Sequence, residues 1–423
     1  MDHHAIRELK MSCSERDMKT MARQAGFTIL EVMIALSVGL VILLGLAGLL
    51  SASVQSQRTM SKDAEQLENG RVALESLAQD VRLAGYYDTF YLPAYMPAVP
   101  SSLPNACATA SASAMYNALA LHVQLHPTTG PTALPTLTAL ASGVSGCGNF
   151  LSTANVAPGS DVVVVRRAST TPVSTGTIPT ALQMYLQAGS FVAQIQTGAG
   201  VSPIGPFYRA DGSPVIDSSA NQATAASADT SYPALNSMQT LAAPVAPSTT
   251  PAPTNGLVFR YLVRIYFVAP CSVGSGASGY AGVAGVCQAG DDTIPTLKRL
   301  DLAPTASGSQ WTLSSVAEGI EAVTLDLGID NYPATTDPYT TMPGDGQPDY
   351  YTHAPSLGEM SNAAAGTLRI LAKGSQGNYI DAKKYDMGYG GGQFMSFNDR
   401  YRRHLYTARV RIENLSQRRE PPK

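Results

Sequence analysis

An uninterrupted apolar run near the start of the chain is the strongest pattern in the sequence. No charged residue occurs between Val32 and Gln57, and the segment up to Leu50 is almost wholly Leu, Val, Ile, Ala, Met and Gly. Because about 20 apolar residues in a helix cross the hydrocarbon layer of a bilayer, residues 27–50 are predicted to span a membrane. Glu31 lies inside the apolar end. A carboxylate there costs roughly 2.5–3.5 kcal/mol on insertion scales, which points to a functional role with a partner.

The helical pattern continues beyond the apolar run. No proline occurs from residue 51 to residue 84, and apolar or small residues recur as one stripe at positions 60, 67, 70, 74, 77, 81 and 84. We therefore expect one helix over residues 27–84, apolar all round in its first half and amphipathic in its second half. Two helices with a break near Ser51–Gln55 are the alternative. Gly85 is a suitable C-terminal stop.

Residues 85–423 are expected to form short strands with long loops. The clearest strand is Leu257–Ala269, which should place one apolar face inward and Arg260 and Arg264 on the other side. Further strands are expected at Asp161–Arg166, Ala181–Gln187, Thr296–Leu302, Ile320–Ile329, Thr367–Lys373 and His404–Leu415. Antiparallel strands with one buried face need a cover, which the amphipathic half of the helix can provide. The pattern predicts an α+β fold in which a long N-terminal helix packs on an antiparallel β-sheet head, with an insert around residues 217–256.

Composition and motifs argue against several classes of function. Charged residues make up 14% of the chain and its formal net charge is −3, which does not favour nucleic acid as a partner. The sequence Gly274–Gly279 matches G-x-G-x-x-G, but no helical pattern follows it. His122 and His126 fall on a strand-like alternation and are expected to face solvent rather than a metal. We expect no enzyme activity and no cofactor; a signal-anchored periplasmic enzyme is the alternative class.

The residues around Glu31 resemble the signal of type IV prepilins. The run Gly26-Phe-Thr-Ile-Leu-Glu31 follows a basic residue and precedes the apolar segment. The resemblance implies that residues 1–26 are a leader, that a prepilin peptidase cuts after Gly26, and that Phe27 becomes N-methylated. It also implies that Glu31 pairs with the amine of a neighbouring subunit. Since the basic leader should stay cytoplasmic, the head is expected in the periplasm, anchored in the inner membrane by residues 27–50.

The C-terminal third is similar to the PilW family of type IV pilus minor pilins. The resemblance is carried by Val316–Val323, Leu368–Leu371 and Tyr401–Leu415. It implies a minor pilin that primes or caps a pilus on a Gram-negative cell surface, with other minor and major pilins and the inner-membrane assembly platform as partners. A type II secretion pseudopilin or a tip adhesin is the alternative. Relatives often carry a denser Asp-Gly run; here Asp345 and Asp349 are a calcium candidate, and an ordinary turn is favoured.

The cysteine count fits removal of a leader. Cys13 would leave with residues 1–26, so four of the five cysteines would remain on an exported chain. Pairing within each half, Cys107 with Cys147 and Cys271 with Cys287, is preferred among three connectivities. Zinc is disfavoured because no histidine lies at ligand spacing from these cysteines.

Overall fold

The computed structural model describes most of the chain in two compact units. These units are Met1–Met60 and Ser61–Lys423, and the helix α1 (Ile29–Arg82) belongs to both. The described residues are 28–88, 90, 97–107, 112–136, 147, 149–173, 183–188, 193–197, 205–206, 239–240, 258–279, 283–303, 311–331, 344–375, 377 and 381–420. The predicted leader lies outside them, as does the predicted insert around 217–256 except for Gln239–Thr240.

The helix α1 is continuous, so the alternative with a break near Ser51–Gln55 is wrong. Its 54 residues contain no proline, and Gly85 follows its end with a φ of +72°, a backbone conformation that glycine adopts without strain. Within the second unit, the buried positions of α1 recur three and four residues apart. They are Gln66, Gly70, Ala73, Leu77, Ala78, Asp80 and Val81.

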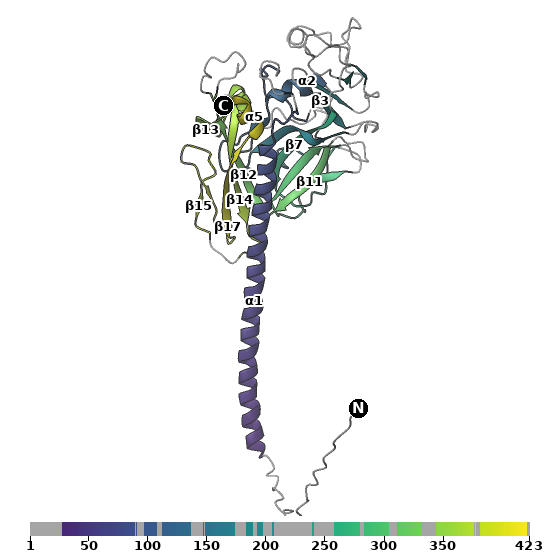
Figure 1. Cartoon of the computed structure of the whole chain (residues 1–423). Coiled ribbons are helices and arrows are strands. Elements are labelled where there is room, and N and C mark those ends of the chain that lie inside the picture. The colour runs from purple at the N-terminus through teal and green to yellow at the C-terminus, as the bar shows by residue number, and fades with distance from the viewer. Residues whose placement is uncertain are drawn as a thin grey trace, which may run out of the picture. The chain divides into compact units, whose positions relative to one another are not determined.

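The larger sheet of the head is antiparallel. Its main path runs β1 (Val123–His126), β2 (Val162–Pro172), β7 (Val258–Ala269), β10 (Thr296–Leu302) and β11 (Trp311–Glu318). β3 (Met184–Ala188) also pairs with β7, and β4 (Ala193–Thr197) pairs with β3. β7 is the central strand, and β11 is the last strand of the path (Figure 1).

The second sheet is formed by the C-terminal part of the chain. Its order is β13 (Tyr350–Thr352), β12 (Ile320–Ile329), β14 (Ala363–Lys373) and β17 (Arg403–Arg411), all antiparallel. Three small strand pairs complete the described strands: β5 (Gly205–Pro206) with β6 (Gln239–Thr240), β8 (Gly276–Ala277) with β9 (Ala284–Val286), and β15 (Lys384–Tyr385) with β16 (Met395–Ser396). The short helices are α2 (Ala112–Asn117), the 3-10 helix η2 (Ala118–Ala120), α4 (Leu357–Ser361) and α5 (Glu413–Arg419).

Two large apolar cores lie on the two faces of the larger sheet. One core joins the second half of α1 to both sheets, through residues such as Leu77, Tyr266 and Leu325. The other covers the opposite face of the larger sheet and includes Phe267 and Trp311. The predicted α+β fold, with a long apolar N-terminal helix and an antiparallel sheet head, is therefore confirmed.

Because apolar cores cover both faces of the larger sheet, one expectation from the sequence is wrong. His122 and His126 were expected to face solvent, but they are only 3% and 0% exposed. A strand that is covered on one face alone would leave them in water; here the opposite face is covered as well. β7 likewise buries Tyr266 and Val268 on the face that was expected to be polar.

Candidate functional site

The first turn of α1 carries Glu31 as an exposed side chain. The backbone N–H of Glu31 donates to the Thr28 carbonyl oxygen at 3.0 Å and to Thr28 Oγ1 at 3.3 Å. A carboxylate in this position is favoured by the positive end of the helix dipole. Gly26 and Phe27, the predicted processing site, lie outside the described residues.

The surface of α1 around Glu31 is apolar and uncovered. Leu30, Met33 and Ile34 are each more than half exposed, and so are most large apolar side chains as far as Leu50. Within the described part of the chain, α1 is the one helix long and apolar enough to cross a membrane, and none of its most apolar stretch is buried. Such a surface buries itself only against lipid or against other helices.

Glu31 has no ion-pair partner near it among the described residues. Among the described residues it forms no ion pair, and the next basic residue along α1 is Arg58. That residue lies 27 positions further on (58 − 31), about 40 Å along an ideal helix. A positive charge that neutralises this carboxylate away from water must therefore come from outside the described chain.

The second half of α1 is attached to the head through a buried carboxylate. Asp80 is 2% exposed; its Oδ1 lies 2.5 Å from Arg264 Nη1 and 3.4 Å from Arg167 Nη2. The Tyr266 hydroxyl donates to Asp80 Oδ2 at 2.5 Å. Burial, together with the Asp80 carboxylate, raises the pKa of Tyr266 to about 12. This cluster fixes the helix against β2 and β7 through charge-assisted hydrogen bonds.

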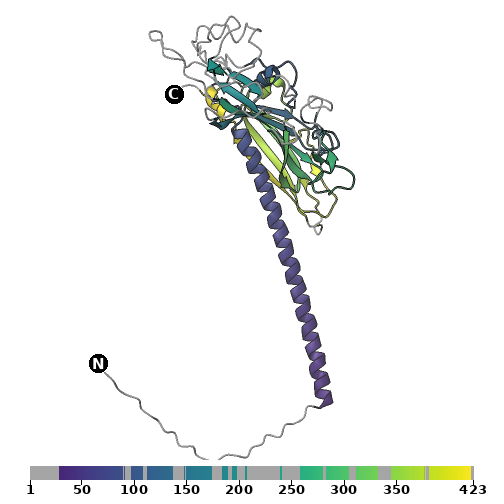
Figure 2. The ribbon, with the colours of Figure 1, turned by 90° about the vertical axis from the view of Figure 1, so that its right-hand side faces the viewer.

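The C-terminal end of α1 is held by residues from the end of the chain. Asn414 Nδ2 donates to the Ala84 carbonyl at 3.2 Å, and Arg418 Nη2 donates to the Gly85 carbonyl at 2.9 Å. Ala84 and Gly85 lie in the turn directly after α1, and positive charge is favoured near the C-terminal end of a helix. Figures 1 and 2 both show α5 beside this end of α1.

A third attachment lies near the start of the second unit. Gln66 Nε2 donates to the carbonyls of Ala372 at 2.8 Å and Arg402 at 3.2 Å. One turn further along, Gly70 packs directly on Tyr406, since a Cβ at Gly70 would lie 2.3 Å from the Tyr406 ring. The helix and the second sheet therefore approach closely at this glycine.

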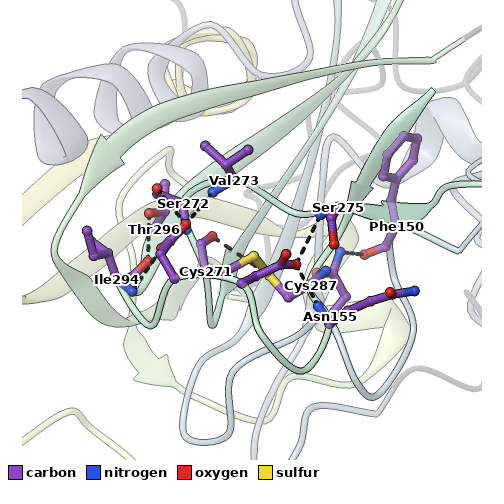
Figure 3. The surroundings of a disulfide bond; sticks show 12 residues. Phe150, Asn155, Cys271, Ser272, Val273, Ser275, Cys287, Ile294 and Thr296 are labelled. Atoms are coloured by element: carbon purple, nitrogen blue, oxygen red, sulfur yellow. Dashed lines mark hydrogen bonds between the residues drawn. A yellow bond between two sulfur atoms is a disulfide. The ribbon is translucent and has the colours of Figure 1, made fainter. Parts of the chain in front are cut away.

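The four cysteines form two disulfides in the pairing preferred from the sequence. Cys107 bonds to Cys147 (S–S 2.06 Å), and Cys271 bonds to Cys287 across a sequence separation of 16. Figure 3 shows the second bond, with Asn155 beside it. The Cys287 N–H donates to Asn155 Oδ1, and Asn155 Nδ2 donates to the Phe150 carbonyl.

Two carboxylates organise the loop around this second disulfide. Asp292 accepts hydrogen bonds from the backbone N–H groups of Ser272, Val273 and Ile294 at 2.8–3.0 Å. These backbone donors hold the pKa of Asp292 well below its usual range. Asp291 accepts in the same way from Ser275 and Gln288. The loop is thus fixed although it projects Val273 into solvent at 72% exposure.

The calcium candidates occupy a hydrogen-bonded turn. Asp345 Oδ1 accepts from the Gln347 N–H at 2.9 Å, and Asp349 Oδ2 accepts from the Asn331 N–H at 2.8 Å. Among the described residues, no group of three or more His, Cys, Asp or Glu side chains could hold a metal ion. The structure thus uses both carboxylates as backbone acceptors.

A buried acid–histidine cluster joins the two sheets. Asp161 accepts from the backbone N–H groups of Thr128 and Leu325, and its carboxylate lies 3.5 Å from His353 Nε2. Burial raises the pKa of Asp161 to about 7, although His353 and the two amides act in the opposite direction. Asp326 lies 3.3 Å from His353 Nδ1 and binds Arg369 at 2.6 Å. These contacts connect the loop after β1 with β12 and β14, which is a structural role.

Two buried polar residues of α1 were missed from the sequence. The predicted stripe includes Met60 and Leu67, but these are 68% and 52% exposed, whereas Gln66 and Asp80 are buried. A regular repeat of apolar residues identifies the buried face of a helix only when the surface on which the helix packs is also apolar. Arg264 on one predicted strand, and Arg167 directly after the end of another, were the available signal for a buried acid on the helix.

Two parts of the chain are similar to known protein families. Residues 282–414 match the family of type IV pilus-assembly protein W, and residues 21–47 match the prokaryotic N-terminal methylation motif. No curated protein and no solved structure matches the chain. The first match covers β9 to β17, and the second covers Glu31 and the start of the apolar helix. Together they support a pilus-related pilin of the PilW type.

Proposed function

We propose that this chain is a minor pilin of a type IV pilus. In this proposal a prepilin peptidase removes residues 1–26, Phe27 becomes the N-methylated first residue, and residues 27–50 hold the processed chain in the inner membrane of a Gram-negative cell. The head then lies in the periplasm, where its two disulfides are stable. The assembly platform later moves the helix into a filament at the cell surface.

The observation that carries the proposal is the unpaired carboxylate on an uncovered apolar helix. Glu31 is exposed, has no ion pair among the described residues, and is surrounded by apolar side chains. In a bundle of such helices an unpaired charge is the costly state, so a neighbour's terminal amine would fix the axial position of each subunit. Glu31 would then set the position of each subunit along the filament and would have no catalytic role.

The similarity to pilus-assembly protein W supports the proposed role as a minor pilin. That similarity includes the strands of the second sheet and its last strand β17. We infer that the chain primes or caps assembly together with other minor and major pilins. The families it resembles are structural and assembly proteins, which is consistent with a protein that is not an enzyme.

The test is N-terminal sequencing of membrane and filament fractions, with and without the prepilin peptidase. The expected result is a chain that starts at an N-methylated Phe27 only when the peptidase is present. Uncut protein in cells that contain the peptidase would overturn the proposal. If the processed chain occurs only in a secretion pseudopilus, the pseudopilin alternative replaces the pilus.

The role of Glu31 has its own experiment. Glu31→Ala should still be processed, but its recovery in filaments should fall by at least tenfold. Glu68→Ala is the matched control, because Glu68 is an exposed glutamate of the same helix outside the apolar segment. Equal recovery of both variants would remove the assembly role of Glu31.

A further inference from the structure

The last strand of the second sheet has a long free edge. β17 is nine residues long and pairs with β14 from Arg403 to Arg411 without a register shift. It is the terminal strand of its sheet, and no other described strand pairs with it. The opposite edge of the same sheet is β13, which has only three residues. A regular edge of this length is a ready template for a further strand.

The backbone along most of this edge is not used by the described parts of the chain. Hydrogen bonds outside the β14 ladder reach the carbonyls of Arg402 and Arg403, from Gln66 and Tyr385. From His404 to Arg411 the described residues provide no further backbone partner. Buried backbone groups normally find such partners, and the described residues leave most of this edge available for pairing.

Two exposed arginines lie at the C-terminal end of this edge. Arg409 and Arg411 lie two positions apart, so they project from the same face of the sheet, and both are exposed. Arg411 pairs with Glu420. Arg409 has no carboxylate partner among the described residues; its guanidinium lies 5.6 Å from the centre of the Tyr351 ring. Exposed arginine and tyrosine side chains are enriched at the centres of protein interfaces.

We propose that the free edge of β17 accepts an extended acidic strand from the head of a different pilin subunit. A strand added to β17 would place alternate side chains next to Arg409 and Arg411. Two carboxylates two positions apart on that strand would complement these arginines. That the partner is a pilin rests on the proposed function; the strand-binding surface itself does not.

The charges select a different subunit rather than a second copy of this chain. Antiparallel pairing of two β17 edges over their full length would place Arg411 of each copy opposite Arg403 of the other, and like charges directly opposite each other are unfavourable. Among the described strands, the other long strand at a sheet edge is β11, which carries a single acidic residue, Glu318, at its end. It cannot supply two carboxylates two positions apart. An acidic strand from another protein fits the edge better than either pairing.

The first experiment measures peptide binding to the purified full chain in uncharged detergent. The probe is a fluorescent nine-residue peptide of alternating Val and Thr, with glutamates at two positions two apart. We expect its affinity to exceed that of the same peptide with lysines by at least tenfold. The double variant Arg409→Glu/Arg411→Glu should reverse this preference, while Arg400→Glu, an exposed arginine outside the strand, should keep it. Equal binding of both peptides to the unaltered chain would overturn the proposal.

A second experiment tests that the contact is a strand pairing. Peptides N-methylated at every even position or at every odd position lose the N–H donors of one edge while their side chains are unchanged. One of the two should lose binding and the other should retain it. Bound peptide should also slow hydrogen exchange in β17 and leave the exchange of β7 unchanged. Equal binding of both methylated peptides, or unchanged exchange in β17, would contradict strand addition.

These outcomes are separable from those of the proposed function. Peptide binding is measured on isolated protein and needs neither cleavage before Phe27 nor filament assembly. If processing fails while acidic peptides bind, the pilin assignment is wrong and the strand-binding edge stands. If processing succeeds while acidic peptides fail to bind, only the edge proposal is lost. Arginine-dependent dimerisation of the chain in place of peptide binding would assign the edge to a second copy and overturn the heterologous partner.

Discussion

Asp80 of α1 and Arg264 of β7 form an ion pair of 2.5 Å at a position where the carboxylate is 2% exposed. Arg264 also lies 3.0 Å from Asp301 on β10, and Arg299 lies 2.8 Å from the same aspartate. One helix residue is therefore linked to two adjacent strands of the larger sheet. A buried pair of this kind is costly to break, because removal of one partner leaves a desolvated charge behind.

Replacement of Asp80 should loosen the helix from the head. We expect Asp80→Asn to lower the free energy of unfolding by about 3–5 kcal/mol, since Arg264 and Arg167 would lose their shared carboxylate. Urea unfolding of the full chain in detergent measures this change. Asp63→Asn is the control: Asp63 pairs with Arg402 at 2.8 Å at a partly exposed site, where the expected cost is below about 1 kcal/mol. Equal costs for both variants would refute the role of the buried pair.

The buried histidines predict a loss of stability on the acid side. Burial lowers the pKa of His122 to about 3 and that of His126 to about 4. Both values lie below the ordinary value of about 6.5, so the unfolded chain binds these protons more readily. Stability should therefore fall as the pH decreases from 6.5 towards 4, by up to about 1.4 kcal/mol per pH unit for each histidine.

The variant His126→Gln should lower the number of protons taken up on unfolding by about one, and so make the dependence of stability on pH less steep. Urea midpoints between pH 4 and pH 8 measure the slope, and the value at pH 8 reports any general destabilisation separately. His126 Nδ1 donates to the Thr136 carbonyl at 3.0 Å, so its Nε2 accepts from Gln124 at 2.8 Å. An identical slope in the variant and the unaltered chain would show that His126 does not contribute.

The acid–histidine cluster of Asp161 and His353 predicts a loss of stability as the pH rises, opposite to the effect of His122 and His126. The pKa of Asp161 is raised to about 7, so the folded chain holds this proton more tightly than the unfolded chain does. Burial lowers the pKa of His353, but its hydrogen bond with Asp326 and the two neighbouring carboxylates raise it above the ordinary value overall. Both groups thus contribute stability at acid pH that is lost as the pH rises through neutrality.

Substitution of Asp161 should remove part of that loss. Between pH 4 and pH 7 the free energy of unfolding of the unaltered chain, relative to that of Asp161→Asn, should fall by up to about 1.4 kcal/mol per pH unit. The same urea series measures it. A difference that grows with pH would contradict the raised pKa of Asp161.

The two disulfides should differ in their effect on stability. In the chain-entropy model, closing the 16-residue separation between Cys271 and Cys287 contributes about 3 kcal/mol, and the 40-residue separation between Cys107 and Cys147 about 4 kcal/mol. Paired Cys→Ser variants, compared by urea unfolding under oxidising conditions, test this order. If the Cys271–Cys287 bond proves the more stabilising, the entropy model is insufficient. The hydrogen bonds of Asp291 and Asp292 would then depend on that disulfide.

The long helix and the strands with strong alternation could be predicted from sequence. The apolar run, the absence of proline and Gly85 define α1, whose observed bounds are Ile29–Arg82. The strand expected at Leu257–Ala269 is observed as β7, and the one expected at Ile320–Ile329 is β12. In these elements the local pattern and the tertiary contacts favour the same structure.

Features that depend on distant partners could not be predicted in this way. His122 and His126 alternate like solvent-facing residues, but a second core covers their face. Asp80 resembles a surface residue of a helix until Arg167 and Arg264 are placed beside it. The strand expected at His404–Leu415 ends at Arg411, because α5 begins at Glu413 and returns towards α1.

The contacts of α5 with α1 also constrain the order in which the molecule can fold. Ala84 and Gly85 receive their partners from residues 330 and 333 positions later in the chain. If the head is exported as proposed above, the turn after α1 cannot be completed until Asn414 and Arg418 have also crossed the membrane. Because contacts between residues so far apart in the chain form slowly, we expect the head to complete its fold only after Asn414 and Arg418 are available. Any truncation before Asn414 would remove the hydrogen-bond donors to the carbonyls of Ala84 and Gly85, although α1 itself would be intact.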